Sequence, residues 1–591
     1  MVELPGNMVL ITTALQETFP KEINEKVLFL GEWCKVYNKK SVWEKFDSQT
    51  MTYHWNDREK LYTDYQSIQI IYEKILLELS SKLNQTHQVN YSLRYWRILI
   101  GPWLGFFIQT LFDRWFMLNT VFDNNQKYHC CVIKREPLSF VPNDMSHFQQ
   151  WFITDDWNEA IYGQLIELCW INKINVTWIE KIKQVPQSFV AKKIPIKKYI
   201  KEKMLPFLNK LFIKDNNFFF ISTYLPLKKE LKLQMRLGQI PNLWKTQSSP
   251  IVKPCSKQRK WQLNGEKGGE FEKVLRKMIP LHIPTVYLEG YSILNKTVDN
   301  LPWPKNPKAI FTSNAYAGDD LFKVWAAKKT ESNTLLVIGQ HGGHFGMNSF
   351  SFHEEHQIKI ADKWLSWGWH DKNRKNITPI GNLKAIGKQV NYSPKGGALM
   401  VENALPRYSY HLYAAPIASQ HLDYFNDQKM FLSSLPIELR QQVLLRLYHC
   451  DYGWNQVDRW QDSMPEVNID LGRKDIKQLM KKSRLYISTY NATTHLESLT
   501  WNIPSIMFWN PEHWELNEQA KPYFKLLEKE GIFHTTPQSA AKKMIEIWDD
   551  VDGWWHSNEV QKARKVFIDQ YARLPEEPLN LLQDIFEHNI N

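Results

Sequence analysis

The sequence predicts an α/β fold with two Rossmann-like domains, each built on a doubly wound parallel sheet, and a cleft between them. The second half of the chain repeats one unit, in which a short apolar strand is followed by a polar turn and a helix. This repeat is typical of a parallel sheet covered on both faces. The first half also begins with short apolar strands. A proline-rich break at residues 301–304 (LPWP) separates the halves, and ligands of such sheets bind beyond the carboxyl ends of the strands.

The N-terminal half supplies strands, helices and one long loop. Residues 98–112 form an apolar run that is closed by Arg97, Asp113 and Arg114. This run has about 15 residues, fewer than the ~20 that span a bilayer, so we expect a deeply buried helix. Residues 238–267 lose regular periodicity, and we expect a long loop there. The other expected elements are strands at residues 8–12, 27–30 and 218–224 and helices at residues 58–83 and 228–237.

The C-terminal half alternates strands with helices. The expected strands are residues 309–312, 335–339, 364–367, 398–401, 443–448, 485–488 and 505–509. The expected helices include residues 319–328, 437–442, 475–482 and 493–499. These elements predict an α/β domain with helical insertions at residues 1–304, a second α/β domain at residues 305–548, and a helical segment at residues 549–591 that packs back on the body.

The composition is that of a globular protein. The 591 residues include 74 Lys and Arg and 62 Asp and Glu, which gives a net charge of +12, and 43% of the residues are hydrophobic. This mixture argues against a largely disordered or collagen-like chain. The 25 Trp residues suit contacts with sugars, bases or protein partners, although most of them belong in the core.

The cysteines and the N-terminus indicate in which cellular compartment the protein is expected. Six cysteines are too few for a disulfide framework and lack zinc-finger spacing, so we expect structural thiols in a reducing compartment. The first residues show neither the basic region nor the apolar core of a signal peptide. We therefore expect a cytoplasmic protein, whose positive charge would allow peripheral contact with an anionic membrane surface.

The strongest local motif leads from a predicted strand into a helix. Residues 488–499 (STYNATTHLESL) begin with small polar side chains, and the N-terminus of the helix offers free N–H groups and a positive dipole to an anion. Asn491, Thr493 and Thr494 are candidates for binding the phosphates of a ligand. Glu497, one turn later, could accept hydrogen bonds from a ribose diol. The alternative is a simple helix cap, with Asn491 or Thr493 at the N-cap.

A glycine-rich turn follows another predicted strand. In residues 339–346 (GQHGGHFG), the backbone at Gly342 and Gly343 could approach a ligand closely. Gln340 and His341 could then hydrogen-bond a phosphate or a leaving group. The spacing matches neither the dinucleotide-binding nor the ATP-binding glycine motif. The alternative is a tight turn that contains a buried histidine.

Four histidines lie close together in the sequence, which raises the possibility of a metal site. They are His341, His344, His353 and His356. The last two are three residues apart and would share one face of a helix. The order is not that of the HExxH zinc motif, and no Cys or Asp cluster adjoins it, so we predict no metal site and a structural helix start instead.

Two charged residues outside these motifs are further candidates. Glu17 lies on the loop after the first strand, where a carboxylate facing the cleft could act as a general base if burial raised its pKa. The alternative is an ordinary surface glutamate. Arg446 lies inside the apolar strand at residues 443–448 (VLLRLY). A charge there is costly unless it is paired, so we expect an acid, a backbone carbonyl or a ligand phosphate beside it.

Taken together, these motifs resemble the C-terminal half of GT-B glycosyltransferases, in a style similar to bacterial capsule and teichoic-acid (CDP-glycerol) transferases. The segments that carry this resemblance are residues 335–346, 361–368 (ADKWLSWG), 443–448, 491–497 and 502–506. The chain is also similar, over almost its whole length, to a transferase family of bacterial O-antigen and other surface-polysaccharide biosynthesis regions. That similarity is clearest in residues 10–18 (LITTALQET), 29–34 (FLGEWC) and 91–103 (YSLRYWRILIGPW).

The resemblance implies a glycosyltransferase that needs neither a metal nor another cofactor. Its substrates would be a nucleotide-activated sugar and a glycan or lipid-linked glycan at the inner membrane. Residues 1–304 would form the acceptor side and residues 305–548 the donor side, with Glu17 and His341 as catalytic residues. The residues expected to bind the donor are Gln340, Gly342, Gly343, Arg446, Asn491, Thr493, Thr494 and Glu497.

The sequence departs from the teichoic-acid transferases at one point, and it also allows alternative functions. Residues 449–451 (HCD) stand where the teichoic-acid transferases tend to carry His-Pro, which leaves the nucleotide base undetermined. A metallohydrolase that uses the four histidines and a catalytically inactive GT-B-like scaffold are the alternatives. A nucleic-acid binder is disfavoured because no long basic run or recognised binding motif occurs, so we expect no nucleic-acid partner.

Overall fold

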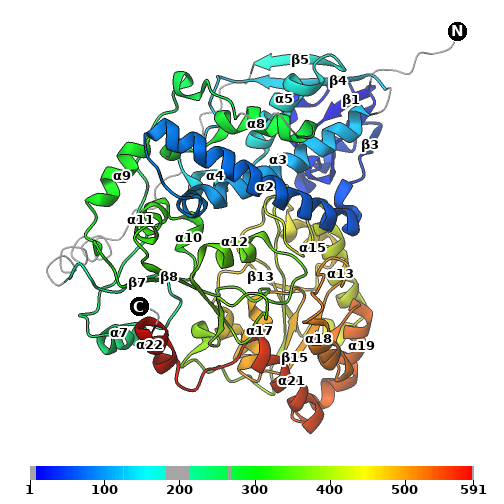
Figure 1. The fold of residues 1–591 in the computed structure, drawn as a ribbon. Coiled ribbons are helices and arrows are strands. Elements are labelled where there is room, and N and C mark those ends of the chain that lie inside the picture. Colours follow the sequence, from blue (N-terminus) through cyan, green and yellow to red (C-terminus); the bar gives the residue numbers. More distant parts are fainter. Residues whose placement is uncertain (1–7, 124–125, 181–212, 264, 266–267, 589–591) are drawn as a thin grey trace, which may run out of the picture.

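The computed structural model describes residues 8–123, 126–180, 213–263, 265 and 268–588. These residues form three sheets, and every strand pairing within them is parallel. The strands are short and apolar, and helices pack on both faces of the sheets, as expected for parallel sheets. The α/β prediction is therefore confirmed, but the described chain contains three sheets and not two (Figure 1).

The three sheets follow one another along the chain. The first has the order β3-β2-β1-β4-β5 and contains β1 (Met8–Ile11), β2 (Val27–Phe29), β3 (Ser48–Thr50), β4 (Tyr128–Lys134) and β5 (Ile174–Glu180). The second has the order β10-β9-β8-β7-β6 and contains β6 (Phe219–Ile221), β7 (Ala309–Thr312), β8 (Leu335–Gly339), β9 (Lys363–Ser366) and β10 (Ile377–Pro379). The third has the order β13-β12-β11-β14-β15-β16 and contains β11 (Gly397–Val401), β12 (Val443–Arg446), β13 (Asn468–Asp470), β14 (Ser483–Ser488), β15 (Ser505–Phe508) and β16 (Phe533–His534).

The helices connect and cover these strands. Those before the third sheet are α1 (Lys40–Trp43), α2 (Arg58–His87), α3 (Leu93–Phe122), α4 (Met145–Trp151), α5 (Asp155–Leu165), α7 (Leu227–Arg236), α8 (Glu270–His282), α9 (Tyr291–Asp299), α10 (Ala315–Gly318), α11 (Asp320–Thr330) and α12 (Phe352–Ile360). Those within and after it are α13 (His421–Ser433), α14 (Ile437–Arg440), α15 (Gln456–Ser463), α16 (Ile476–Met480), α17 (Thr493–Thr500), α18 (Lys521–Lys529), α19 (Pro537–Ile547), α20 (Val551–Trp555), α21 (Asn558–Tyr571) and α22 (Pro578–His588).

Helix α3 is the buried helix that the sequence predicts. Every residue from Ile98 to Arg114 is buried, because the helix packs against α2, α5, α11 and α12 (Figure 1) and is apolar on all sides. A Cβ at Gly105 would collide with the Phe352 ring of α12, and a Cβ at Gly101 would lie 2.8 Å from His356 Cε1. These two glycines therefore let α12 lie directly on α3.

The predicted boundary at residue 304 does not coincide with a boundary between sheets. Strand β6 precedes this residue and pairs with β7, which follows it. The C-terminal helices lie back on the body, where α21 contacts α17 and α18, and α22 contacts α7. One cluster of buried hydrophobic side chains extends through all three sheets. The six cysteines are unpaired, and no helix in the described part of the chain has the length and apolar character that crossing a membrane requires.

Candidate functional site

The two motifs that the sequence singles out lie against each other. The glycine-rich turn follows β8 in the second sheet, and the Asn491 motif follows β14 in the third. A Cβ at Gly343 would collide with the carbonyl group of Ala492 and lie 2.7 Å from Thr493 Cα. Only glycine permits this approach. Asn491 Nδ2 also donates to Asn348 Oδ1 at 3.1 Å, so a second contact joins the two motifs. We call the place where they meet the junction.

The N-terminus of α17 carries no side-chain cap. Its N-cap residue is Ala492, which offers no hydrogen-bonding side chain. The alternative of a simple cap, with Asn491 or Thr493 at the N-cap, is therefore wrong. Neighbouring helices such as α16 and α19 are capped in the ordinary way, by Asp475 and Thr536. The first-turn N–H groups of an α-helix lack partners within the helix, and at α17 the backbone of Ala492 and Thr493 lies against the glycine-rich turn.

The hydroxyl groups of the first turn have different surroundings. Thr494 Oγ1 lies 2.7 Å from the Tyr486 hydroxyl, which donates to it, and 3.0 Å from the Tyr490 hydroxyl. These tyrosines fix the Thr494 side chain within the protein. Thr493 follows the N-cap directly and is partly exposed, so its hydroxyl belongs to the accessible part of this junction.

A lysine joins the two motifs. Lys384, in the short 3-10 helix Leu383–Ala385 after β10, lies with its Nζ 3.0 Å from Glu497 Oε1. The Glu497 side chain is 8% exposed and that of Lys384 is 35% exposed. Lys384 is also close enough to His341 to lower the pKa of that imidazole. The junction thus brings together the Lys384 ammonium group, the Glu497 carboxylate and the positive end of a helix dipole.

His341 is one of several buried histidines near this junction. Burial lowers the pKa of His341 to about 3, and the proximity of His353 and His344 acts in the same direction. Burial also lowers the pKa of His344 to about 3 and that of His353 to about 4. The pKa of His411 lies well below its usual range for the same reason. All four imidazoles are therefore uncharged at neutral pH, and each has a lone pair that can accept a proton.

A cavity of about 290 Å³ lies beside these histidines, at the carboxyl ends of β11 and β12. We call it the central cavity. Its lining comes from α3, from α4 and the residues that follow it, from α12, and from the loops after β11 and β12. No Asp, Glu, Lys or Arg is among the described residues that line it. The rings of His353 and His411 meet edge to face at 4.7 Å. Its polar lining residues are Gln149, His353, Asn403, Tyr410, His411, Tyr413, Tyr448 and Tyr452.

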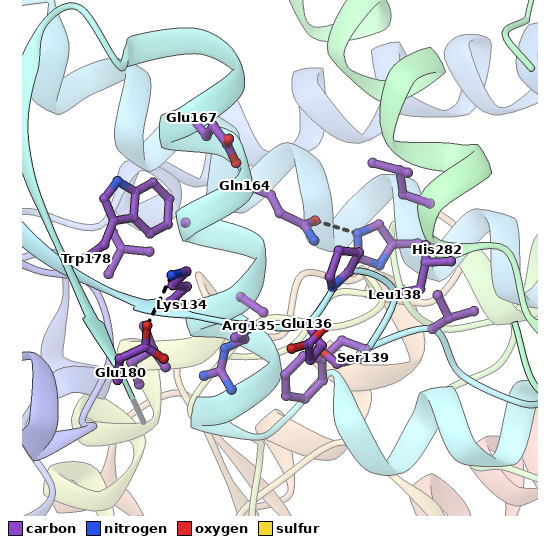
Figure 2. Close-up of a pocket in the computed structure, with 18 residues that line it drawn as sticks. Lys134, Arg135, Glu136, Leu138, Ser139, Gln164, Glu167, Trp178, Glu180 and His282 are labelled. Carbon is purple, nitrogen blue, oxygen red and sulfur yellow. Dashed lines mark hydrogen bonds and ion pairs between the residues drawn. The ribbon is translucent and has the colours of Figure 1, made fainter. Parts of the chain in front are cut away.

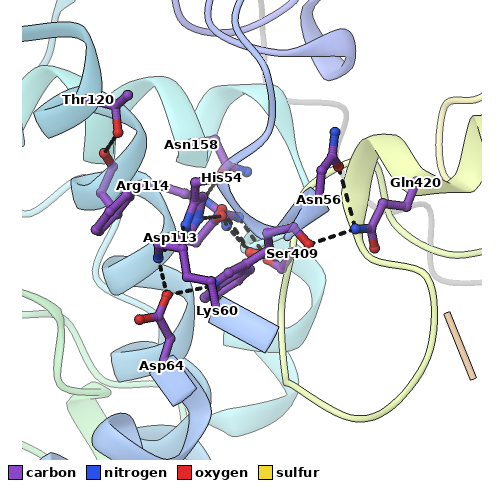
Figure 3. A network of polar contacts seen from close by, with 12 residues as sticks. His54, Asn56, Lys60, Asp64, Asp113, Arg114, Thr120, Asn158, Ser409 and Gln420 are labelled. Atoms are coloured by element: carbon purple, nitrogen blue, oxygen red, sulfur yellow. Dashed lines mark hydrogen bonds and ion pairs between the residues drawn. The ribbon is translucent and has the colours of Figure 1, made fainter. Parts of the chain in front are cut away.

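The segment of residues 403–413 carries much of this lining, and a buried polar network holds it (Figure 3). Arg114 of α3 donates to the Ser409 hydroxyl at 2.5 Å and to the Ser409 carbonyl at 2.8 Å, and it pairs with Asp113 at 2.6 Å. His54 Nε2 donates to Asp113 Oδ1 at 2.9 Å. Burial opposes the charge on Asp113, but these hydrogen bonds and the Arg114 guanidinium hold its pKa below the usual range.

The same segment also contacts α5, a helix that packs against β4 of the first sheet. Arg407 pairs with Asp155 at 2.6 Å, and the Tyr408 hydroxyl donates to Asp155 at 2.5 Å. Asp155 also accepts from the backbone of Ala14, on the loop after β1. Helix α5 thus supports the cavity wall through partly buried polar contacts.

Several predicted site residues lie outside this junction or are engaged elsewhere. Glu17 is exposed and does not line the central cavity, so it lacks the burial expected of a general base. Gln340 donates to the Gly342 carbonyl at 2.8 Å and accepts from Trp367 and Trp369, which fixes the turn. Arg446 pairs with Asp470 at 3.0 Å, in agreement with the expected acid partner.

The histidine-based metal site does not form. His356 is buried against α3, and neither of its ring nitrogens has a hydrogen-bond partner. In the part of the chain that the structure describes, no group of three or more His, Cys, Asp or Glu side chains has an arrangement that could hold a metal ion. The geometry on which the metallohydrolase alternative depends is therefore missing from the described residues.

Comparison with known proteins identifies the family. A model of the LIC12162 family transferases matches residues 8–586. The chain belongs to this family of transferases. None of the curated proteins compared with it matches. One similar solved structure is the wall teichoic acid polymerase TagF, with 12% identity and a TM-score of 0.28 over 67% of this chain and 96% of that chain. MurG of Acinetobacter baumannii has 11% identity and a TM-score of 0.28 over 78% of this chain and 99% of that chain. WaaG, a glycosyltransferase involved in lipopolysaccharide biosynthesis, has 11% identity and a TM-score of 0.26 over 51% of this chain and 95% of that chain.

This transferase contains site residues that the sequence analysis does not predict. Lys384 reaches the junction, and His411 the central cavity, only through the packing of separate sheets. The aromatic run at residues 408–413 (YSYHLY), after the β11 strand, is the one sequence signal for the central cavity. A lysine in a short loop after β10 carries no comparable signal.

Proposed function

We propose that this transferase is a glycosyltransferase that uses a nucleotide-activated sugar, with the donor phosphates at the N-terminus of α17. The observation that carries the proposal is the contact between this uncapped N-terminus and the glycine-rich turn at Gly343. Free N–H groups, a helix dipole and the nearby Lys384 ammonium group together favour a diphosphate.

The residues of the junction have distinct roles in this proposal. The backbone at Gly342 and Gly343 lets the phosphates approach, and the Thr493 hydroxyl donates to one of them. Lys384, which pairs with Glu497 at 3.0 Å, turns towards the phosphates when the donor binds. Glu497 then accepts from the ribose hydroxyls. Gln340 and Arg446 are engaged within the protein and are not part of the proposed donor site.

The reaction needs a base for the acceptor hydroxyl and stabilisation for the departing nucleotide. Neutral imidazoles at His341, His353 and His411 line or adjoin the central cavity and can accept the hydroxyl proton. A bound diphosphate would raise the pKa of His341 from its low value, because a nearby anion favours the protonated form. Lys384 and the α17 dipole would stabilise the charge that develops on the leaving phosphate. Glu17 remains a predicted alternative base on the acceptor side.

The acceptor in this proposal is a bacterial surface glycan, free or lipid-linked, that approaches through the uncharged, aromatic central cavity. Aromatic rings and tyrosine hydroxyls suit sugar rings, which present both apolar faces and polar edges. We propose that the reaction requires no resident metal or cofactor and that the enzyme works in the cytoplasm in peripheral contact with the inner membrane.

A panel of nucleotides tests the proposal. Thermal melting of the purified protein is measured with CMP-, UDP-, GDP-, dTDP- and CDP-linked sugars, beside a Glu497→Gln variant. A ligand at 100 times its Kd stabilises by about 2.7 kcal/mol. We expect one nucleotide to raise the Tm of the wild type and to have a much smaller effect on the variant. No shift with any nucleotide, or equal shifts in both proteins, would contradict the proposed donor site.

A further inference from the structure

A second cavity lies beside the first sheet and apart from the junction. It encloses about 680 Å³ and shares no lining residue with the central cavity. This volume falls within the roughly 300–1,000 Å³ typical of small-molecule sites. The walls come from β4 and the loop after it, α5, the π-helical segment Ile166–Trp170, β5 and the end of α8 (Figure 2). The cavity thus lies at the carboxyl ends of β4 and β5, where parallel sheets bind ligands.

Both cations that line this cavity lie beside carboxylates. Lys134 Nζ lies 3.1 Å from Glu180 Oε1 (Figure 2). Arg135 bonds Glu159 at 2.6 Å, and its guanidinium lies 4.8 Å from the centre of the Phe140 ring. Lys134 and Arg135 are the Lys and Arg residues of the lining. A phosphate or another anion would therefore find no unpaired positive charge among the described lining residues.

The remaining polar groups are mostly hydrogen-bond acceptors. Glu136 and Glu167 line the cavity, and within the described ranges neither carboxylate has an ion-pair partner. His282 Nε2 lies 2.7 Å from Gln164 Oε1 (Figure 2), so the ring nitrogen donates to the amide oxygen. Burial lowers the pKa of His282 to about 3, and its Nδ1 keeps a lone pair without a partner. His282 is buried, whereas Glu136 and Glu167 are exposed, and these two carboxylates suit a ligand that donates hydroxyl hydrogens.

An aromatic ring completes the lining. Trp178 on β5 is 45% exposed, and Figure 2 shows its indole between Glu167 and Lys134, whereas the Gln164 side chain extends towards His282. An exposed indole in a cavity that also contains carboxylate and amide groups can pack on an apolar face while the polar groups bond the edge of the same ligand. A sugar ring has this combination of an apolar C–H face and a hydroxyl-bearing edge.

We infer that this cavity binds an uncharged sugar residue of a glycan chain. The Trp178 ring stacks on the sugar face, Glu167 accepts from its hydroxyls, and the Gln164 amide nitrogen donates to them. The inference rests on the proposed function for one point, namely that this glycan is the acceptor of the transferase. The cavity would then hold the chain at a residue remote from the reacting hydroxyl.

Retention on a glycan array tests the inference. The full-length protein is applied to an array of bacterial surface polysaccharides and neutral oligosaccharides, beside Trp178→Ala and Glu167→Gln. Leu168→Ala is the matched control, because Leu168 is 38% exposed on the same π-helical segment but does not line the cavity. We expect the wild type and the control to be retained alike, Trp178→Ala to lose at least tenfold in retention, and Glu167→Gln to lose severalfold.

Nucleotide binding, measured by thermal melting on the same preparations, separates this inference from the proposed function and reports on folding. No retention of the wild type on any glycan, or equal retention of Trp178→Ala, would overturn the sugar site even if nucleotides bind. Retention that depends on Trp178 in a protein that binds no nucleotide would support the sugar site and contradict the proposed function.

Discussion

Lys384 connects the two motifs of the junction, although its own sequence surroundings give no sign of this position. Its ammonium group pairs with Glu497 and lies close enough to His341 to affect the pKa of that residue. Glu497 and His341 both belong to sequence motifs, since each follows an apolar strand at a turn. Lys384 follows β10, a strand that the sequence does not predict, and only the fold brings it to the site.

Removing the Lys384 charge tests this arrangement at the level of one residue. We expect Lys384→Met to weaken binding of the preferred nucleoside diphosphate by about 10- to 100-fold, because a hydrogen bond to a charged group contributes about 1.5–3 kcal/mol. Isothermal titration measures the Kd. The control is Lys359→Met, which removes a lysine of α12 that pairs with Glu73 away from the junction. Equal Kd values for Lys384→Met and the wild type would exclude Lys384 from the donor site.

At the scale of elements, the glycine-rich turn and α17 act as one unit. The turn belongs to the second sheet and the helix to the third, yet they meet at Gly343 without space for a side chain. The sequence predicts both elements because each joins a short apolar strand to small polar residues. Their contact depends on the packing of two sheets, which local patterns do not encode.

Adding one methyl group at this contact tests whether the turn and the helix act together. In Gly343→Ala, the new Cβ meets the backbone of Ala492 and Thr493, so the turn and the helix must separate. Such overpacking typically costs 1–3 kcal/mol, and we expect a lower Tm together with weaker nucleotide binding. Gly269→Ala is the control, because Gly269, like Gly343, has no positive φ but has nothing within 4 Å of its Cβ position. If Gly343→Ala binds nucleotide as tightly as the wild type, the contact does not shape the site.

At the scale of the whole molecule, the sequence predicts the strands of the second and third sheets better than those of the first. Strands β7, β8, β11 and β14 are short apolar runs buried along most of their length. Strand β5, by contrast, alternates and is largely exposed, so it gives no apolar run. The number of sheets could not be predicted either, because β6 and β7 pair across the proline-rich break. Non-local pairing of this kind is decided by packing and leaves no local pattern.

The buried histidines make the whole fold sensitive to acid. Burial lowers the pKa of His282, His421 and His495 to about 3, whereas an unfolded histidine titrates near pH 6.5. Between these values the unfolded state binds more protons, so stability is complete above about pH 6.5 and falls as the pH drops towards 3. Each group contributes up to about 1.4 kcal/mol per pH unit.

Melting curves at pH 8, 7, 6 and 5 check this expectation. The Tm should be nearly constant from pH 8 to 7 and fall below pH 6.5. His421→Phe removes one buried titrating ring and should reduce that fall, while His370→Phe, at an exposed position, should not. A Tm that stays constant down to pH 5, or an equal fall in His421→Phe, would show that these rings are not buried in their neutral form.

We propose that the uncapped N-terminus of α17, the glycine-rich turn and Lys384 together bind the phosphates of a nucleotide-activated donor. A crystal structure of the protein soaked with the nucleotide that stabilises it most tests this directly. We predict phosphate density within hydrogen-bonding distance of the Thr493 backbone nitrogen and of Lys384 Nζ, with Glu497 at the ribose. Nucleotide density elsewhere, with the N-terminus of α17 free of ligand, would contradict the account.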